Sequence, residues 1–198
     1  MTALVATAAI AACGNAPPRP TEPTPPPAPS LTEADRFRTA CDGGELDACS
    51  ALGLLYQVGD GVANDPAKAS ALYRRGCDGG SMRGCFNLAV AYHEGSGVPH
   101  DLVAETELLS RACDRDYAVA CLNLGVHYDL GSPAVKEDPR RAAEFYRKAC
   151  GSDDLESIRG ACYNLAVLLG QGRGVALDLD QATKALRRGC DHADGKSC

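Results

Sequence analysis

The sequence contains no tryptophan, and its 198 residues include only three phenylalanines and two methionines. Large aromatic side chains dominate the burial in many small cores, so a core carried by Trp and Phe side chains is excluded. No apolar run reaches the roughly 20 residues that a membrane-spanning helix needs. The formal net charge of −6 excludes the basic surface that phosphate backbones require, and we therefore expect no nucleic acid partner.

Cysteine, in contrast, is abundant, with eleven residues in the chain. A domain with little aromatic bulk needs another source of stability, and disulfides are the usual one. Because disulfides persist only in oxidising compartments, the cysteine count predicts an exported protein.

The first thirteen residues are predicted to be a signal peptide. Ala3 to Ala12 are small and apolar, as in the hydrophobic part of a secretory signal, and the segment ends Ile10-Ala11-Ala12-Cys13-Gly14. This ending resembles a bacterial lipobox, which implies that Cys13 is acylated and anchors the protein to a membrane facing the periplasm or the cell surface. No Lys or Arg precedes the apolar run, and a plain secretory signal is the alternative.

Residues 14–30 are predicted to be a linker, and residues 31–198 the folded domain. Ala16 to Pro29 contain eight prolines, which favour an extended tether without a core.

The cysteines mark an internal repeat in the folded domain. Five of them recur at intervals of 36, 36, 37 and 40 residues: Cys41, Cys77, Cys113, Cys150 and Cys190. A regular spacing of this length indicates stacked supersecondary units. We place four units near residues 41–76, 77–112, 113–149 and 150–189, with partial units at both ends.

Each unit has the pattern of a helical hairpin. Cys85, Leu88, Ala89 and Tyr92 lie at i, i+3, i+4 and i+7, which is one face of a first helix. Glycines follow this helix, and an aspartate, such as Asp101, is predicted to cap a second helix. The second helix of the second unit carries Glu105 where other units have alanine, so this hairpin is expected to pack less closely or to place Glu105 at an edge.

The segment Leu52 to Ala69 follows the pattern LGxxYxxGxGVxxDxxKA and resembles a Sel1-like repeat. The paired cysteines resemble the cysteine-rich Hcp-type group of that family, the Hcp beta-lactamase family. The resemblance recurs four times and implies an all-α, right-handed α/α solenoid of TPR-like helical hairpins. It implies no single function, because fold and function separate easily.

Each repeating cysteine has a second cysteine downstream, eight residues away in four cases and twelve in one. The favoured pairs place the end of one hairpin beside the start of the next: Cys41–Cys49, Cys77–Cys85, Cys113–Cys121, Cys150–Cys162 and Cys190–Cys198. The rival scheme joins the ends of one hairpin, such as Cys49 with Cys77, and leaves Cys41 and Cys198 unpaired. Cysteine spacing of this kind does not suit zinc, and we expect no metal and no cofactor.

No catalytic constellation is evident in the sequence. The four histidines are scattered, and the motifs Ser-x-x-Lys, Ser-Asp-Asn and Lys-Thr-Gly of serine β-lactamases are absent. The favoured function is therefore a scaffold that binds a protein or peptide in the cell envelope. The alternative, implied by the resemblance alone, is a β-lactam-binding protein or slow β-lactam hydrolase.

A column of asparagines gives the candidate binding residues. Asn87, Asn123 and Asn164 each follow a cysteine by two residues and would line the concave face formed by successive first helices. Their carboxamides present donors and acceptors for a peptide backbone, and His127 lies four positions further on. The alternative is that these asparagines bond neighbouring turns and hold the repeats in register.

Overall fold

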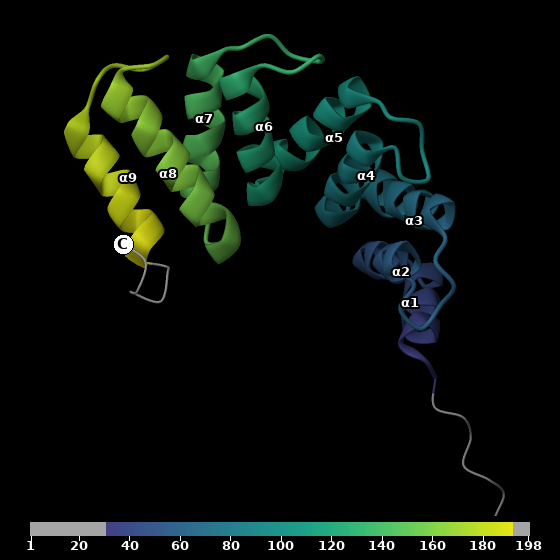
Figure 1. Cartoon of the computed structure of the whole chain (residues 1–198). Coiled ribbons are helices and arrows are strands. Elements are labelled where there is room, and N and C mark those ends of the chain that lie inside the picture. Colours follow the sequence, from purple (N-terminus) through teal and green to yellow (C-terminus); the bar gives the residue numbers. More distant parts are fainter. Residues whose placement is uncertain (1–30, 192–198) are drawn as a thin grey trace, which may run out of the picture. The chain divides into compact units, whose positions relative to one another are not determined.

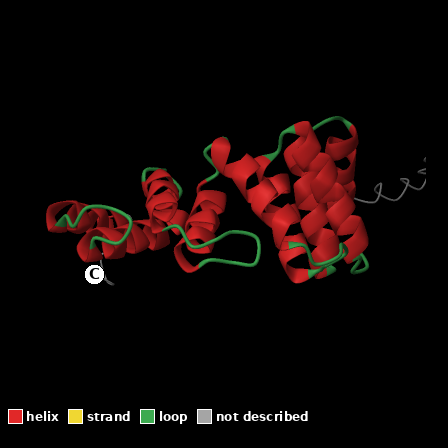
Figure 2. Cartoon of the chain, turned by 90° about the horizontal axis from the view of Figure 1, so that it is seen from above, coloured by secondary structure: helices red, strands yellow, loops and turns green. Residues whose placement is uncertain are grey.

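Helices joined by turns make up residues 31–191, which are the residues that the computed structural model describes; for residues 155, 156 and 191 the backbone alone is described. This range contains nine α-helices and no β-strand (Figure 1, Figure 2). The helices are α1 (Glu33–Asp42), α2 (Leu46–Val58), α3 (Pro66–Gly79), α4 (Met82–Glu94), α5 (Leu102–Asp114), α6 (Ala118–Leu130), α7 (Pro139–Cys150), α8 (Leu155–Gln171) and α9 (Leu179–Asp191). The predicted all-α class is confirmed.

The helices pair into four hairpins that stack in chain order. We call α2–α3, α4–α5, α6–α7 and α8–α9 hairpins 1 to 4. Each second helix packs against its own first helix, and those of hairpins 1 to 3 also pack against the first helix of the next hairpin. The helix α1 holds the place of a second helix, because it ends near Cys41 as α3 ends near Cys77. The result is the solenoid that the repeat predicts.

The hairpin turns follow the chemistry predicted for them. Gly59, Gly95 and Gly172 end the first helices with φ between 65° and 79°, a conformation that glycine adopts without strain. Asp65 and Asp101 then accept hydrogen bonds from backbone N–H groups in the first turn of the second helix. The predicted turns therefore fix where each hairpin reverses.

Within a hairpin, residue sizes at two facing positions are matched. In hairpins 1 and 3 a glycine of the first helix lies under a tyrosine ring of the second. A Cβ added to Gly53 would lie 2.6 Å from Cε1 of Tyr73, and one added to Gly125 would lie 2.4 Å from Tyr146. In hairpin 2 the equivalent pair is Ala89 with Leu109. A smaller partner on one helix therefore accompanies a larger one on the other, which keeps the helix separation similar.

Four disulfides cross-link consecutive second and first helices: Cys41–Cys49, Cys77–Cys85, Cys113–Cys121 and Cys150–Cys162, with Cα–Cα distances of 4.4–4.8 Å. All eight cysteines are buried. Each closes a short loop, which contributes about 2–3 kcal/mol in the chain-entropy estimate. Cys198 of the fifth predicted pair lies outside the described residues, as do Cys13 and the residues predicted to be a signal peptide and a linker.

The longer spacing of the fourth pair lengthens a helix. Cys150 and Cys162 are twelve residues apart instead of eight, and α8 has 17 residues where α2, α4 and α6 have 13. The four additional residues thus extend α8 by about one turn at its N-terminus.

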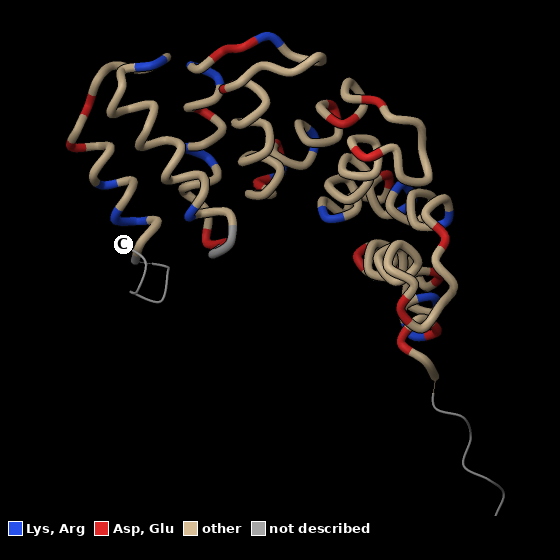
Figure 3. Tube along the Cα trace, viewed as in Figure 1, with Lys and Arg blue, Asp and Glu red and all other residues tan. Residues whose placement is uncertain are grey.

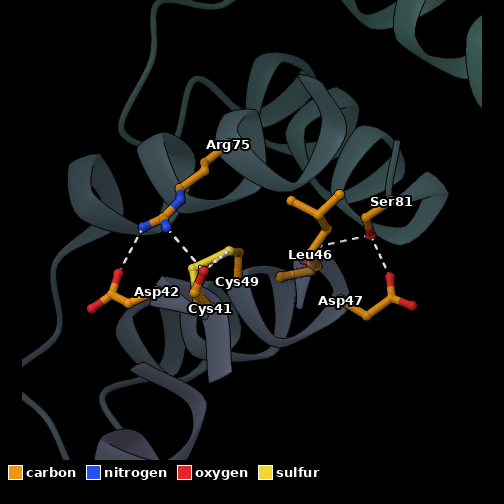
Figure 4. The surroundings of a disulfide bond; sticks show 8 residues. Cys41, Asp42, Leu46, Asp47, Cys49, Arg75 and Ser81 are labelled. Atoms are coloured by element: carbon orange, nitrogen blue, oxygen red, sulfur yellow. Dashed lines mark hydrogen bonds and ion pairs between the residues drawn. A yellow bond between two sulfur atoms is a disulfide. The ribbon is translucent and has the colours of Figure 1, made fainter. Parts of the chain in front are cut away.

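A cation from the next hairpin binds the carbonyl group of the first cysteine in each pair. Figure 4 shows the first case, in which Arg75 of α3 reaches across the Cys41–Cys49 disulfide. Its Nη2 donates to the Cys41 carbonyl oxygen at 2.9 Å, and its Nη1 lies 2.9 Å from Asp42 Oδ1. The carbonyl belongs to the last turn of α1, where backbone oxygens lack helical partners and a positive charge is favourable.

The same contact recurs at every described junction. Arg111 bonds the carbonyl of Cys77 at 2.9 Å, Lys148 that of Cys113 at 2.6 Å, and Arg188 that of Cys150 at 2.7 Å. These four residues, which we call the capping cations, all precede a cysteine by two positions. Each junction is therefore held by a disulfide and by a charged hydrogen bond to the same cysteine.

Replacing a capping cation should weaken the stack. Lys148→Met removes the bond to Cys113 and the 3.1 Å ion pair with Asp116 while keeping the apolar stem. Because this group is partly exposed, we expect a loss of about 1 kcal/mol in the free energy of unfolding, measured by urea denaturation. The adjacent exposed Arg147→Met is the control and should change it by less than about 0.5 kcal/mol. Equal losses in the two variants would contradict a role for the capping cation.

Candidate functional site

Two neighbouring pockets lie where the first helices begin. Pocket A, of about 430 Å³, lies against α1 and α2 and is lined by Arg36, Phe37, Ala40, Glu45, Asp47, Ala48, Ala51 and Arg83. Pocket B, of about 440 Å³, lies at the start of α6 and the turn before α8 and is lined by Arg83, Asp116, Tyr117, Ala118, Val119, Ser152, Asp153 and Asp154. Arg83 lines both, so the pockets adjoin at the first turn of α4.

Arg83 and Tyr117 form the centre of this region. The Tyr117 ring packs against Phe86 of α4 with ring centroids 5.7 Å apart. Burial raises the pKa of the Tyr117 phenol, and the nearby positive charge of Arg83 opposes that rise. Asp154 and Asp47 lie close enough to raise the same pKa. The centre thus offers a neutral phenol, a guanidinium and carboxylates beside apolar walls.

An apolar row continues along the first helices beside the pockets. Its members follow the second cysteine of each pair by five residues: Leu54, Val90, Val126 and Val167. Leu54 is 50% exposed and the three valines are half-buried. The neighbouring column contains half-buried Phe86 and Leu122 and the exposed Tyr163. We call the first four residues the apolar row.

The asparagine column lies beside this row, and two of its members make contacts within the domain. Asn123 Nδ2 donates to the Val119 carbonyl of its own helix at 2.9 Å. Burial raises the pKa of Tyr146 and Asp129 raises it further, whereas Asn164 lies close enough to the phenol to oppose this rise. All three asparagines are half-buried. They therefore flank the row, and at least two also serve the fold.

His127 does not lie with the asparagines on an open face. Its side chain is 16% exposed, and its Nε2 lies 3.4 Å from Oε1 of Glu105 on α5. His93 of α4 approaches the same oxygen with Nδ1 at 3.2 Å. The three side chains, from α4, α5 and α6, form a polar cluster between hairpins 2 and 3. We call it the Glu105 cluster.

Glu105 is buried, so the expectation that it lies at an edge is wrong. The residue is 5% exposed, because the small residues at equivalent positions, such as Ala69 and Ala142, are core residues and Glu105 occupies the same place. Glu105 Oε2 and His127 Nδ1 are buried without a hydrogen-bond partner. Buried polar atoms without partners cost free energy, so the cluster is a weak point in the stack.

The Glu105 cluster is a feature that the sequence analysis missed, although its signal was present. The position of His127 is filled by Leu55, Ala91 and Leu168 in the other hairpins, and all three are buried. Two residues of adjacent units thus depart from the repeat in the same way, each placing a titratable group at an apolar position. Aligning the four units would have shown that Glu105 and His127 both replace apolar core residues, and it would have suggested that their side chains meet.

Replacing Glu105 and His127 by the apolar residues found at these positions in other hairpins tests how much the Glu105 cluster lowers the free energy of unfolding. We expect His127→Leu alone to lose about 1–3 kcal/mol of unfolding free energy, because Glu105 keeps only His93 as a partner. The double variant Glu105→Ala/His127→Leu should be at least as stable as the natural chain, since apolar residues often replace a buried ionic pair without loss. Chemical denaturation measures both. A double variant less stable than the natural chain would refute this account.

The described residues contain no group of three His, Cys, Asp or Glu side chains placed to hold a metal ion. Within the same residues, no helix is both long enough and apolar enough to cross a membrane.

The repeats match a known family. The Sel1 repeat matches four times, over residues 46–81, 83–117, 118–154 and 160–193, each match beginning near a first helix. The chain belongs to the Sel1 repeat family. No curated protein is matched by this chain.

Solved structures of Sel1-like proteins are similar to this chain. A protective antigen present in uropathogenic Escherichia coli strains, displaying an SLR fold, is 27% identical over 81% of this chain and 33% of its own, with a TM-score of 0.73. A Sel1 repeat protein from Oxalobacter formigenes is 24% identical over 81% of this chain and 64% of its own, with a TM-score of 0.71. This Sel1 repeat chain therefore spans about a third and about two thirds of these two relatives. The fold is an all-α, disulfide-linked Sel1 solenoid.

Proposed function

We propose that this Sel1 repeat chain is an exported, lipid-anchored scaffold that binds a protein or peptide partner in the bacterial cell envelope. The observation that carries the proposal is the apolar row beside two adjoining pockets on one series of helices. Apolar side chains exposed beside polar groups are typical of interaction sites. Repeats present such surfaces side by side, which suits an extended ligand.

Each residue of the proposed surface would make a different kind of contact with the ligand. Leu54 and the valines of the row supply apolar contact, and Arg83 with Tyr117 supplies polar contact at the pockets. Asn87, Asn123 and Asn164 are proposed to bind the ligand backbone at the side of the row, since a carboxamide has more donors and acceptors than one internal bond uses. His127 is proposed to act through the Glu105 cluster, which sets how hairpins 2 and 3 pack.

The cross-links support the proposed location. Disulfides at the hairpin junctions require an oxidising compartment to form and persist. The lipobox-like sequence before Cys13 supports an anchor, and the Pro-rich segment would separate the domain from the membrane.

Hydrolysis of β-lactams is not proposed. Ser152 accepts a hydrogen bond from the backbone of Asp154. Lys148 lines an adjoining pocket together with Ser152, but its Nζ donates to the Cys113 carbonyl and pairs with Asp116 instead of bonding the serine hydroxyl. A serine nucleophile needs a base at its hydroxyl.

Site-specific photo-crosslinking tests the binding surface. A photoreactive residue at Leu54, which is 50% exposed, should crosslink a partner in envelope preparations. The same residue at Glu144, exposed on the second helix α7, is the control and should not. With the captured partner purified, Leu54→Asp should weaken its binding about tenfold, or about 1.4 kcal/mol. Equal crosslinking at both sites, or an unchanged affinity, would exclude the row as the binding surface.

Labelling tests the anchor separately. Cells that express the full chain should incorporate labelled palmitate into it, and Cys13→Ser should abolish the label while the domain still folds, because Cys13 precedes the folded residues. Label retained in Cys13→Ser, or absent from the natural chain, would reject the lipoprotein assignment.

A further inference from the structure

The outer side of the last described helix, α9, exposes a position that is buried in the preceding hairpins. Tyr73, Leu109 and Tyr146 occupy equivalent places on α3, α5 and α7 and are 1–2% exposed. The equivalent residue on α9 is Leu186, which is 43% exposed. The helices α3, α5 and α7 each pack against the first helix of the next hairpin as well as against their own first helix, whereas no helix follows α9 within the described residues.

Leu186 belongs to a short stripe on α9. Leu179 lies seven residues earlier, on the same side of the helix, and is 65% exposed. Thr183 lies between the two leucines and is also exposed. Two exposed leucines two turns apart form the apolar seam that helix pairing uses.

Charged residues beside the stripe are arranged for antiparallel pairing. Asp180 follows Leu179, and Arg187 follows Leu186, so an acid lies at the start of the stripe and a base at its end. Both are exposed. Figure 3 shows acidic residues at the start of α9 and basic ones towards its end. A helix with this order complements a second copy of itself that runs in the opposite direction.

We propose that this stripe is a self-association surface and that its occupant is the α9 helix of a second copy of this chain. In a two-fold antiparallel pair, Leu179 of each copy packs against Leu186 of the other, with Thr183 near the axis. Asp180 then lies beside Arg187 of the other copy, twice in each dimer. Such an isologous contact closes on itself and does not propagate into a fibre.

The order of charges along α9 favours an antiparallel second copy over a parallel one. A parallel pair would place Asp180 beside Asp180 and Arg187 beside Arg187, which repel. The pairing also aligns the helix dipoles in opposite directions, with the positive N-terminus of each helix beside the negative C-terminus of the other. One helix pair buries little surface, so the dimer is expected to be weak.

Sedimentation equilibrium of the full chain, cleaved of its signal segment and with residues 192–198 present, tests the proposal. Over a range of about 1 to 500 µM the natural chain should shift from monomer to dimer, as expected for a small interface. Asp180→Arg alone and Arg187→Asp alone should each weaken dimerisation about tenfold, because each brings like charges together. The double variant Asp180→Arg/Arg187→Asp should restore dimerisation to within about threefold, since it keeps the charges complementary.

Two further variants complete the test. Leu186→Glu should abolish the dimer, whereas Asp60→Arg, a reversal in the exposed turn of hairpin 1, should leave it unchanged. Circular dichroism checks that every variant folds. A chain that stays monomeric over the whole concentration range overturns the proposal. So does a double variant as weak as the single ones, because the charges would then not face each other.

Discussion

The disulfide between the end of one second helix and the start of the next first helix is the constraint on which the rest of the fold depends. It fixes two helices at a turn of only a few residues, and a capping cation from the following hairpin then binds the carbonyl of the same cysteine. The covalent bond constrains the unfolded chain, while the cation ties each junction to the hairpin after it. A repeat that cannot bury a large aromatic core is thereby held in register with few bulky side chains.

Packing inside the hairpins also reflects the scarcity of tryptophan and phenylalanine. Tyr73 and Tyr146 supply the bulk that tryptophan and phenylalanine supply elsewhere, and each needs a glycine on the facing helix. Burial raises the pKa of Tyr73 to about 12, so the phenol stays neutral and donates to Gln57 at 2.6 Å. Hairpin 2 has Leu109 in place of this tyrosine, and it carries Glu105 where hairpins 1 and 3 have Ala69 and Ala142. The junction after it is therefore the one described junction where an acid replaces a small core residue, and it is the place where two parts of the stack can most readily differ in packing.

The sequence predicts the periodic features of this molecule and misses those that depend on one unit meeting the next. The hairpins, the turn glycines and the aspartate caps follow from local patterns that repeat, and the structure has them where they were expected. For Glu105 the expectation was a less closely packed hairpin or a place at an edge, and for His127 it was a place at a binding face, because each residue was considered within its own unit. Their contact joins residues 22 positions apart on different hairpins. The apolar row was missed for a related reason: the periodicity locates a helix face, but the exposed fraction of Leu54 depends on how neighbouring hairpins cover it.

Disulfide mapping of the native, unreduced protein tests the central claim most directly. After proteolysis with free thiols blocked, mass spectrometry should recover the short-range pairs Cys41–Cys49, Cys77–Cys85, Cys113–Cys121 and Cys150–Cys162 as the dominant cross-linked peptides. Pairs that join the ends of one hairpin, such as Cys49 with Cys77, or blocked thiols at these eight positions, would contradict it. Either result would leave the junctions without the bond that holds them.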